Sequence, residues 1–189
     1  MNKRAKNILN FWFIKSTPKE KFGRSDIFDR KIKNLFFKDY QKAINNKYDH
    51  WQDNAEECLS LIILLDQFSR NLFRNNSKAF EMDNKAKLVA KNAIKKKYHK
   101  KLPNDQILFI FLPLMHSEFL DDQIYCNELI DKYLIDSPNY SEIKKFSKIH
   151  LNIIKKFGRF PYRNKVLKRK NTLEENKYLN STHYSFFNI

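Results

Sequence analysis

The sequence predicts an all-α fold built from stacked helical hairpins. Long segments without Gly or Pro carry apolar residues at helical spacing, and the abundant Leu, Lys and Glu favour helices. The chain contains only two glycines and two valines. Because glycine favours tight turns and valine favours strands, this composition argues against a large β-sheet. At 189 residues we expect a single domain over 1–189, with a polar and aromatic tail at 179–189 that gives no structural signal.

Four helices are expected in the first half of the chain. They cover residues 4–15, ending before Pro18, residues 26–46, a segment that starts at Asn54 and runs through 59–65, and a segment from Asp83 to near Pro103. Asn54 is a favourable N-cap, because its side-chain oxygen accepts from free helix N–H groups, and Glu57 three residues later predicts a capping box. None of these apolar segments reaches the ~20 residues that span a bilayer.

The second half predicts a helical region over 105–134, broken or kinked at Pro113, because proline lacks an N–H and crowds the preceding turn. A further helix covers 140–157, and Gly158 stands where a left-handed residue ends a helix. Thr172 with Glu175 predicts a capping box for a last short helix. No internal repeat is evident, so the stacked arrangement is inferred from helix lengths.

Composition excludes several classes of function. Gly23 and Gly158 are the only glycines, so the sequence contains neither a glycine-rich phosphate loop nor a dinucleotide-binding fingerprint. The net charge of +16 suggests nucleic acid, but it arises from 29 Lys against 8 Arg in an Asn- and Ile-rich chain, as AT-rich codons would produce. The charge is spread evenly, so nucleic-acid binding is the least favoured reading and is expected to be weak and non-specific.

The two cysteines, Cys58 and Cys126, lie apart without metal-binding spacing. Such isolated cysteines are typical of reduced thiols in a cytoplasmic protein. We therefore expect a cytoplasmic chain with no metal site, no cofactor and no membrane partner.

Three segments differ from the Lys- and Asn-rich background: 65–74 (LDQFSRNLFR), 112–118 (LPLMHSE) and 157–164 (FGRFPYRN). Four of the eight arginines lie in them, namely Arg70, Arg74, Arg159 and Arg163. A guanidinium binds carboxylate or phosphate through two parallel hydrogen bonds and stacks on aromatic rings, which an ammonium cannot do. Arginine at these positions therefore indicates a geometric requirement.

Each arginine segment has a structural and a functional interpretation. On a helix, Asp66, Arg70 and Arg74 form a charged stripe that either pairs internally or binds an external anion, and internal pairs are the commoner case. Arg159 and Arg163 flank Phe160 and Tyr162, so this loop either stacks a ligand ring or forms a packed corner, and the residues favour neither.

His116, Glu118 and His150 are the candidates for acid–base chemistry. Residues two apart do not share a helical face, so the spacing of His116 and Glu118 favours a structural role. No nucleophile motif or metal-binding set accompanies the histidines.

The chain resembles the bacterial domain-of-unknown-function 924 family over nearly its whole length. The resemblance is carried by these three segments in this order, preceded by Phe11-Trp12-Phe13 and followed by 172–175 (TLEE). Ser69 stands where the family usually has proline, and Tyr162 where it usually has histidine, which argues against catalysis at Tyr162. The resemblance implies an all-α fold similar to tetratricopeptide-type repeats. The family has no settled activity, so the resemblance implies no particular reaction.

The leading hypothesis is a tetratricopeptide-like binding protein whose helices converge on a pocket for an anionic ligand: a phosphate ester, a carboxylate metabolite or an acidic peptide segment. The candidate ligand-binding residues are Asp66, Gln67, Arg70, Asn71, Arg74, His116, Glu118, Arg159, Arg163 and Asn164. The alternative is a small-molecule enzyme that uses His116 or His150 as acid or base.

Overall fold

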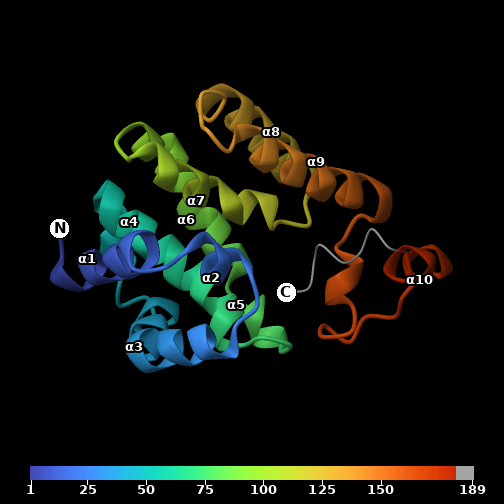
Figure 1. The fold of residues 1–189 in the computed structure, drawn as a ribbon, viewed down its shortest axis with the longest axis horizontal. Helices are drawn as coiled ribbons and strands as arrows, with labels where there is room; N and C mark the ends of the chain where they lie inside the picture. The colour runs from blue at the N-terminus through green and yellow to red at the C-terminus, as the bar shows by residue number, and fades with distance from the viewer. Residues whose placement is uncertain (182–189) are drawn as a thin grey trace.

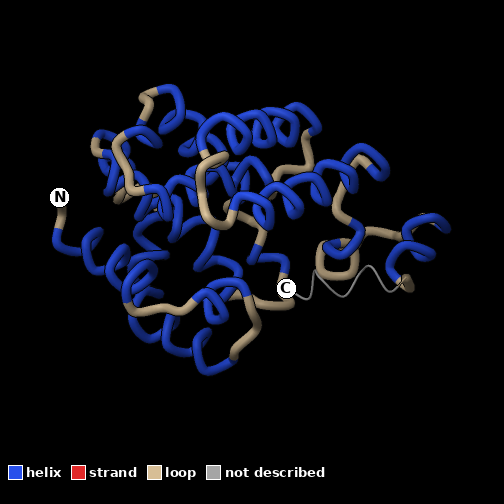
Figure 2. The backbone as a smooth tube through the Cα atoms, turned by 45° about the horizontal axis from the view of Figure 1, so that its top comes forward, coloured by secondary structure: helices blue, strands red, loops and turns tan. Residues whose placement is uncertain are grey.

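The computed structural model describes residues 1–181, and all regular structure within them is helical (Figures 1 and 2). The α-helices are α1 (Lys3–Leu9), α2 (Pro18–Phe22), α3 (Asp26–Ile44), α4 (Ala55–Ile62), α5 (Ser69–Leu72), α6 (Asp83–Lys95), α7 (Asn104–Met115), α8 (Leu120–Tyr133), α9 (Tyr140–Phe157) and α10 (Leu173–Leu179). The predicted all-α class is confirmed. Of the predicted tail, residues 182–189 lie outside the described part.

Short helical turns join these helices. Four are 3₁₀ turns: η2 (Asp49–Asp53), η4 (Ser77–Ala79), η5 (Tyr98–Lys100) and η6 (Pro161–Arg163). Two are π-helical and continue an α-helix without a break: η1 (Asn10–Ile14) follows α1, and η3 (Ile63–Phe68) joins α4 to α5. The first of the three distinctive sequence segments therefore begins on a widened helical turn.

Apolar side chains from most helices meet in one large core. Trp12, Trp51, Phe68 and Phe111 are fully buried there. Helix α8 packs against both α7 and α9, and Figure 1 shows α8 and α9 side by side. A second, smaller apolar cluster forms around Phe160, where the chain leaves α9 and turns toward α10. The C-terminal segment is thus attached to the body through its own set of contacts.

Several predicted helix ends are confirmed, but the helix predicted from Asp83 to near Pro103 ends at Lys95, before Lys97 adopts a left-handed conformation. The Asn54 side chain accepts from the backbone N–H groups of Glu56 and Glu57, as an N-cap should. The Glu57 carboxylate binds the backbone N–H of Asn2 instead of closing a capping box. Thr172 and Glu175 form the predicted box at α10, and a similar box that was not predicted begins α2.

The break predicted at Pro113 lies elsewhere. Pro113 is inside α7, and the chain leaves the helix only after Met115. Ser117 stabilises the turn between α7 and α8, because its hydroxyl accepts a hydrogen bond from the backbone N–H of Phe119 just before α8. The side-chain amide of Gln123 donates to the carbonyls of Met115 and Ser117 at 2.6 and 2.7 Å, which satisfies groups that the end of α7 leaves free. The turn at 116–119 is therefore fixed by side-chain hydrogen bonds.

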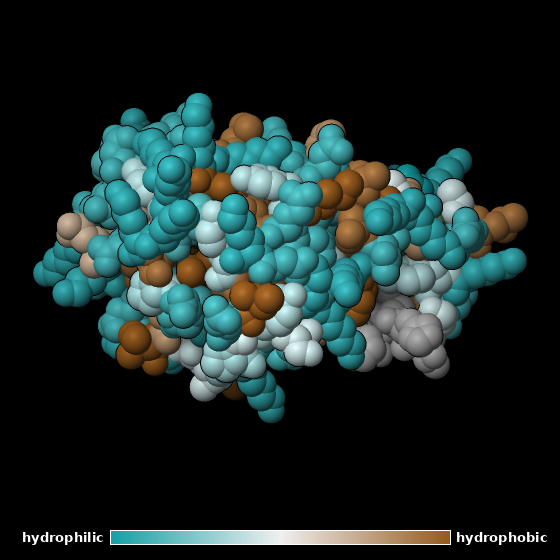
Figure 3. Space-filling model, turned by 90° about the horizontal axis from the view of Figure 1, so that it is seen from above, coloured by the Kyte–Doolittle hydropathy of each residue, from teal (hydrophilic) through white to brown (hydrophobic). Residues whose placement is uncertain are grey.

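Polar side chains dominate the face of the molecule that Figure 3 shows. Figure 3 shows hydrophilic residues over most of one face, with apolar side chains in small separate groups. Within residues 1–181, no helix combines the length and the apolarity required to cross a membrane.

Gly158 ends α9 in the left-handed region, with φ of 67°. We expect Gly158→Ala to lower the free energy of unfolding by about 1 kcal/mol, because a Cβ disfavours this conformation although no atom lies within 4 Å of its position. Gly158→Asn should lose less, since asparagine tolerates the region better. Urea unfolding checks this, and equal stability of Gly158→Ala and the parent chain would contradict it.

Candidate functional site

A cavity of about 760 Å³ lies where four segments meet: η4, the start of α6, the turn at 116–119 and η6. Its walls are formed by Ser77, Lys78, Phe80, Glu81, Asp83, Asn84, Lys87, His116, Ser117, Glu118, Phe119, Arg163 and Leu167. The cavity therefore brings together residues from the end of the second distinctive segment, from the end of the third and from the start of α6. This cavity is the candidate site.

His116 is held in the cavity wall by a buried carboxylate. Its Nδ1 lies 2.8 Å from Oδ1 of Asp66, whose side chain is 1% exposed. A carboxylate only accepts hydrogen bonds, so Nδ1 carries the hydrogen. No partner for Nε2 occurs within residues 1–181, so that nitrogen is available to a ligand.

Asp66 is kept ionised by its neighbours. Burial raises the pKa of its carboxyl, but His116, Arg70 and the Gln67 amide outweigh burial and hold the pKa below its usual range. The Gln67 amide donates to Oδ2 at 2.6 Å, and Arg70 lies 3.5 Å from Oδ1. The predicted pairing of Asp66 with Arg70 is present, and it forms the rear wall behind His116.

Arg70 and Arg163 bind the same carboxylate. They lie 2.6 and 3.1 Å from the two oxygens of Asp83, at the start of α6. Both guanidiniums stack on the ring of Phe80, with distances of 4.8 and 4.6 Å to its centroid. Arg163 also stacks on Phe160 and donates to the backbone carbonyl of His116 at 3.0 Å. Arg163 therefore joins the third distinctive segment to the second.

Glu118 closes a second link between these segments. Its carboxylate accepts two hydrogen bonds from Arg169, at 2.7 and 3.0 Å, and one from the backbone N–H of Phe160. Burial raises the pKa of Glu118, but Arg169 and the other donors bring it below its usual range. Its oxygens are thus engaged, and the geometry favours a structural role over the acid–base role considered from the sequence.

Lys87 supplies a buried ammonium to the cavity wall, 3.5 Å from the hydroxyl of Ser117. It lies 3.2 Å from Asp122 of α8, which also binds Lys91 at 2.5 Å and the Ser117 hydroxyl at 2.6 Å. The ring of Phe119 covers the ammonium at 4.0 Å. Burial raises the pKa of Asp122, but Lys91, Ser117 and Lys87 bring it below its usual range. The Asp122 carboxylate therefore pairs with both Lys87 and Lys91.

Of the four predicted arginines, Arg163 lines the cavity, whereas Arg70, Arg74 and Arg159 do not. α5 ends at Leu72, so Arg74 leaves the helical stripe and binds both oxygens of Asp29 at 2.7 and 2.9 Å. Arg159 binds both oxygens of Glu175 at 2.6 and 2.8 Å. The single pocket lined by all four predicted arginines is not formed by the described residues, because two of them bind internal carboxylates elsewhere.

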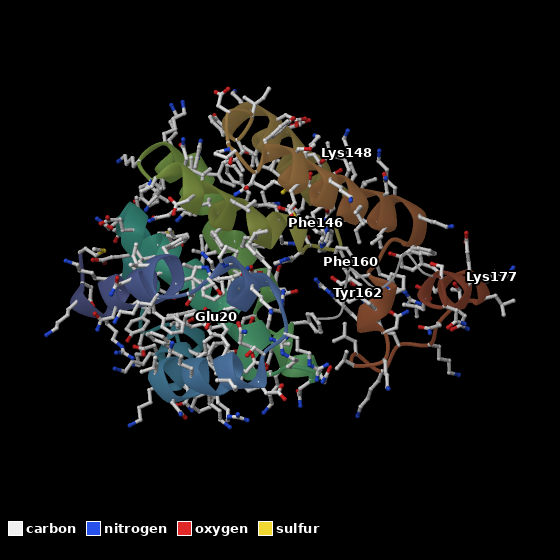
Figure 4. The ribbon with its side chains drawn as sticks, viewed as in Figure 1. Glu20, Phe146, Lys148, Phe160, Tyr162 and Lys177 are labelled. Carbon is white, nitrogen blue, oxygen red and sulfur yellow. The ribbon has the colours of Figure 1, made fainter. Side chains whose placement is uncertain are left out.

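The remaining candidates also make internal contacts. Asn71 donates to Asp29, and Asn164 donates to Asn171. Figure 4 shows Phe160 and Tyr162 on the segment between α9 and α10. Their rings lie 5.3 Å apart and form part of a packed corner around Arg163. Of the two interpretations of this loop, the packed corner is the one present.

His150 is buried beneath the cavity wall. Its Nδ1 donates to the carbonyl of Phe146, and its ring lies 6.3 Å from that of His116. Burial lowers the pKa of His150 to about 3, so the ring is neutral near pH 7. This environment suits a core histidine and not a group that exchanges protons with a ligand.

Sequence reasoning missed Lys78, Lys87, Phe80 and Phe119 as cavity residues. Lys87 lies on an ordinary amphipathic helix in a lysine-rich chain, so nothing in its pattern distinguishes it. Within residues 1–181, no group of three or more His, Cys, Asp or Glu side chains is placed to hold a metal ion.

Replacing Arg163 tests the requirement for a guanidinium. Lysine would keep the charge but lose the stacking and the paired contacts, so we expect Arg163→Lys to lower the free energy of unfolding by about 2–3 kcal/mol. Arg24→Lys, at an exposed position, is the matched control and should change it little. Equal unfolding midpoints for the two variants would show that the arginine geometry is dispensable.

The neutral His150 predicts a loss of stability in mild acid. Folding lowers the pKa of His150, so below about pH 6.5 this residue is protonated in the unfolded chain and neutral in the folded chain. The free energy of unfolding therefore falls as the pH drops below about 6.5. One such group contributes a slope of at most about 1.4 kcal/mol per pH unit. Unfolding of His150→Phe between pH 7 and 5 should show a smaller slope, whereas the exposed control His50→Phe should keep the original one. Identical slopes in all three proteins would contradict this.

Comparison with known proteins supports the resemblance seen in the sequence. A family model described as "Bacterial protein of unknown function (DUF924)" matches residues 8–183. The solved structure of a protein of unknown function, ATU0120 from Agrobacterium tumefaciens, is similar with a TM-score of 0.86 and 31% sequence identity, covering 93% of this chain and 96% of that chain. No curated protein matches significantly. The chain belongs to the DUF924 family.

Proposed function

We propose that the protein binds a small organic anion, a carboxylate or a phosphate ester, in the cavity lined by Lys78, Lys87 and His116. The observation that carries the proposal is that two donors on its wall, the Lys78 ammonium and Nε2 of His116, have no partner within residues 1–181. Lys87 shares its carboxylate with Lys91 and so is only partly neutralised. A bound carboxylate or phosphate would supply the acceptors that these groups lack.

The charges around the cavity are compatible with one added anion. Among the described residues, the cations in and behind its walls are Arg70, Arg163, Arg169, Lys78, Lys87 and Lys91, and the carboxylates are Asp66, Glu81, Asp83, Glu118 and Asp122. Six cations thus face five carboxylates. Protonation of His116 would raise this excess of one positive charge to two, which a phosphate ester would neutralise.

The aromatic walls favour a ligand with an apolar or ring portion. Phe80 lies in the wall with two guanidiniums stacked on it, which fixes its orientation. Phe119 is 66% exposed, and Leu167 adds a further apolar surface. Aromatic side chains of this kind bury large apolar areas of a ligand while a few polar groups set its orientation.

Two further features belong to the proposal. The succession of α7, α8 and α9, each packed on the next, supports a tetratricopeptide-like stacking of hairpins. Cys58 and Cys126 are free thiols, and burial raises the pKa of each to about 12, which suits an unreactive role in the reducing cytoplasm.

A second candidate function is favoured by the contact between Asp66 and His116. A carboxylate that fixes Nδ1–H and leaves Nε2 toward a cavity is the arrangement used by histidines that act as general bases. The same cavity would then hold a substrate with a proton to transfer to Nε2. Within this candidate, His116 is the acid–base residue and Glu118 and His150 are structural.

Thermal unfolding with phenyl phosphate tests the binding proposal. At ten times its Kd the compound should raise the Tm by roughly 3–5 °C, since binding to the folded state alone adds about 1.4 kcal/mol. Lys78→Gln should reduce this shift, whereas Lys33→Gln, the same charge change at an exposed site, should leave it unaltered. Phenol is the uncharged control. No shift with phenyl phosphate, or an equal shift in Lys78→Gln, would overturn the proposed site.

A further inference from the structure

The hydrogen bond between Asp66 and His116 gives the cavity a group that can exchange a proton. Because Asp66 is buried and ionised, Nδ1 of His116 remains a donor to it whether or not the ring is charged. Any proton gained or lost must therefore be at Nε2. The ring is 16% exposed and lines the cavity, so Nε2 is the nitrogen that a ligand can reach.

The charges that face His116 oppose one another. The ionisable groups on the neighbouring elements are Asp66 of η3, Arg70 of α5, Asp83 and Lys87 of α6, His150 of α9 and Arg163 of η6. Asp66 favours an imidazolium, but it already interacts with Arg70, and Arg163 donates to the backbone carbonyl of the same histidine. Glu118, in the same turn, is engaged by Arg169.

A new negative charge in the cavity would change this balance. Two carboxylates on the elements around His116 are already shared: Asp66 with Arg70, and Asp83 between Arg70 and Arg163. An oxyanion placed at Nε2 would be the first acceptor that this nitrogen meets within the described structure. It would favour the protonated ring through both charge and a hydrogen bond.

We infer that His116 takes up one proton at Nε2 when an oxyanion occupies the cavity, so that the bound complex contains an imidazolium held between Asp66 and the ligand. The inference rests on the proposed function, because it requires the cavity to bind an anion. Solvent supplies the proton, Nε2 gains it, and no bond in the ligand is broken. Asp66 acts as a positioning residue, since it contacts the histidine and not the ligand.

The direction of the pH dependence follows from this uptake. Binding that consumes a proton weakens as the pH rises, because the proton becomes scarcer. One proton changes the affinity by at most about tenfold per pH unit.

Calorimetry of phenyl phosphate binding tests the inference. Titrations at pH 7.5 in two buffers with different ionisation enthalpies give the number of protons taken up on binding. Phenyl phosphate itself titrates in this region, so the readout is the difference between the parent chain and His116→Asn. The asparagine amide can still donate to Asp66 from the position of Nδ1, but it cannot bind a proton. His50→Gln is the control for removal of an exposed histidine.

We expect the parent chain and His50→Gln to take up more protons than His116→Asn, and the affinity of the variant to depend less on pH between 6 and 8. Equal proton uptake in all three proteins would overturn the inference while leaving the proposed binding site intact. Absence of binding to the parent chain would instead overturn the proposed function itself.

A second measurement covers the case in which His116→Asn does not bind. The imidazole ¹⁵N signals of His116, identified by their absence from the variant, should move toward imidazolium values when phenyl phosphate is added to the parent chain at pH 7.5. Signals that stay in place or move toward the neutral form would overturn the inference without any need for binding by the variant.

Discussion

The shape of the cavity depends on one shared carboxylate, that of Asp83, which binds Arg70 on one side and Arg163 on the other. The first contact ties α6 to α5, and the second ties it to η6, a segment 80 residues further along the chain. Phe80 stacks against both guanidiniums, so charge and packing fix the same atoms. Removing Asp83 would leave the buried guanidinium of Arg163 without its carboxylate partner, and an uncompensated buried charge is strongly destabilising.

Most of the arginines in this lysine-rich chain have a structural explanation. Arg4, Arg74, Arg159 and Arg169 each bind both oxygens of one internal carboxylate, the geometry that a lysine cannot reproduce. The sequence predicts a need for guanidinium geometry at Arg70, Arg74, Arg159 and Arg163, and in the structure Arg74 and Arg159 each bind a carboxylate through two hydrogen bonds. The negative groups that they bind are the protein's own, so the proposed ligand would instead meet lysines and a histidine.

Local features of the sequence predict the helices well and their assembly poorly. Asn54, Gly158 and Thr172 mark helix ends, because caps depend on residues within one turn. Pro113 shows the limit of local rules: its helix continues to Met115 and ends where Ser117 and Gln123 satisfy the free backbone groups.

The candidate site is harder to predict because its contacts join distant segments. Asp66 and His116 are 50 residues apart, and the sequence singles out both without indicating that they meet. Lys78 and Lys87 carry no signal at all among so many lysines. Since the links through Asp83 and Glu118 and the hydrogen bond from Asp66 hold His116 in place, a ligand would meet a histidine whose position is already set and would lose less free energy in ordering it. The structural role of the arginines and the availability of His116 are thus two consequences of the same network.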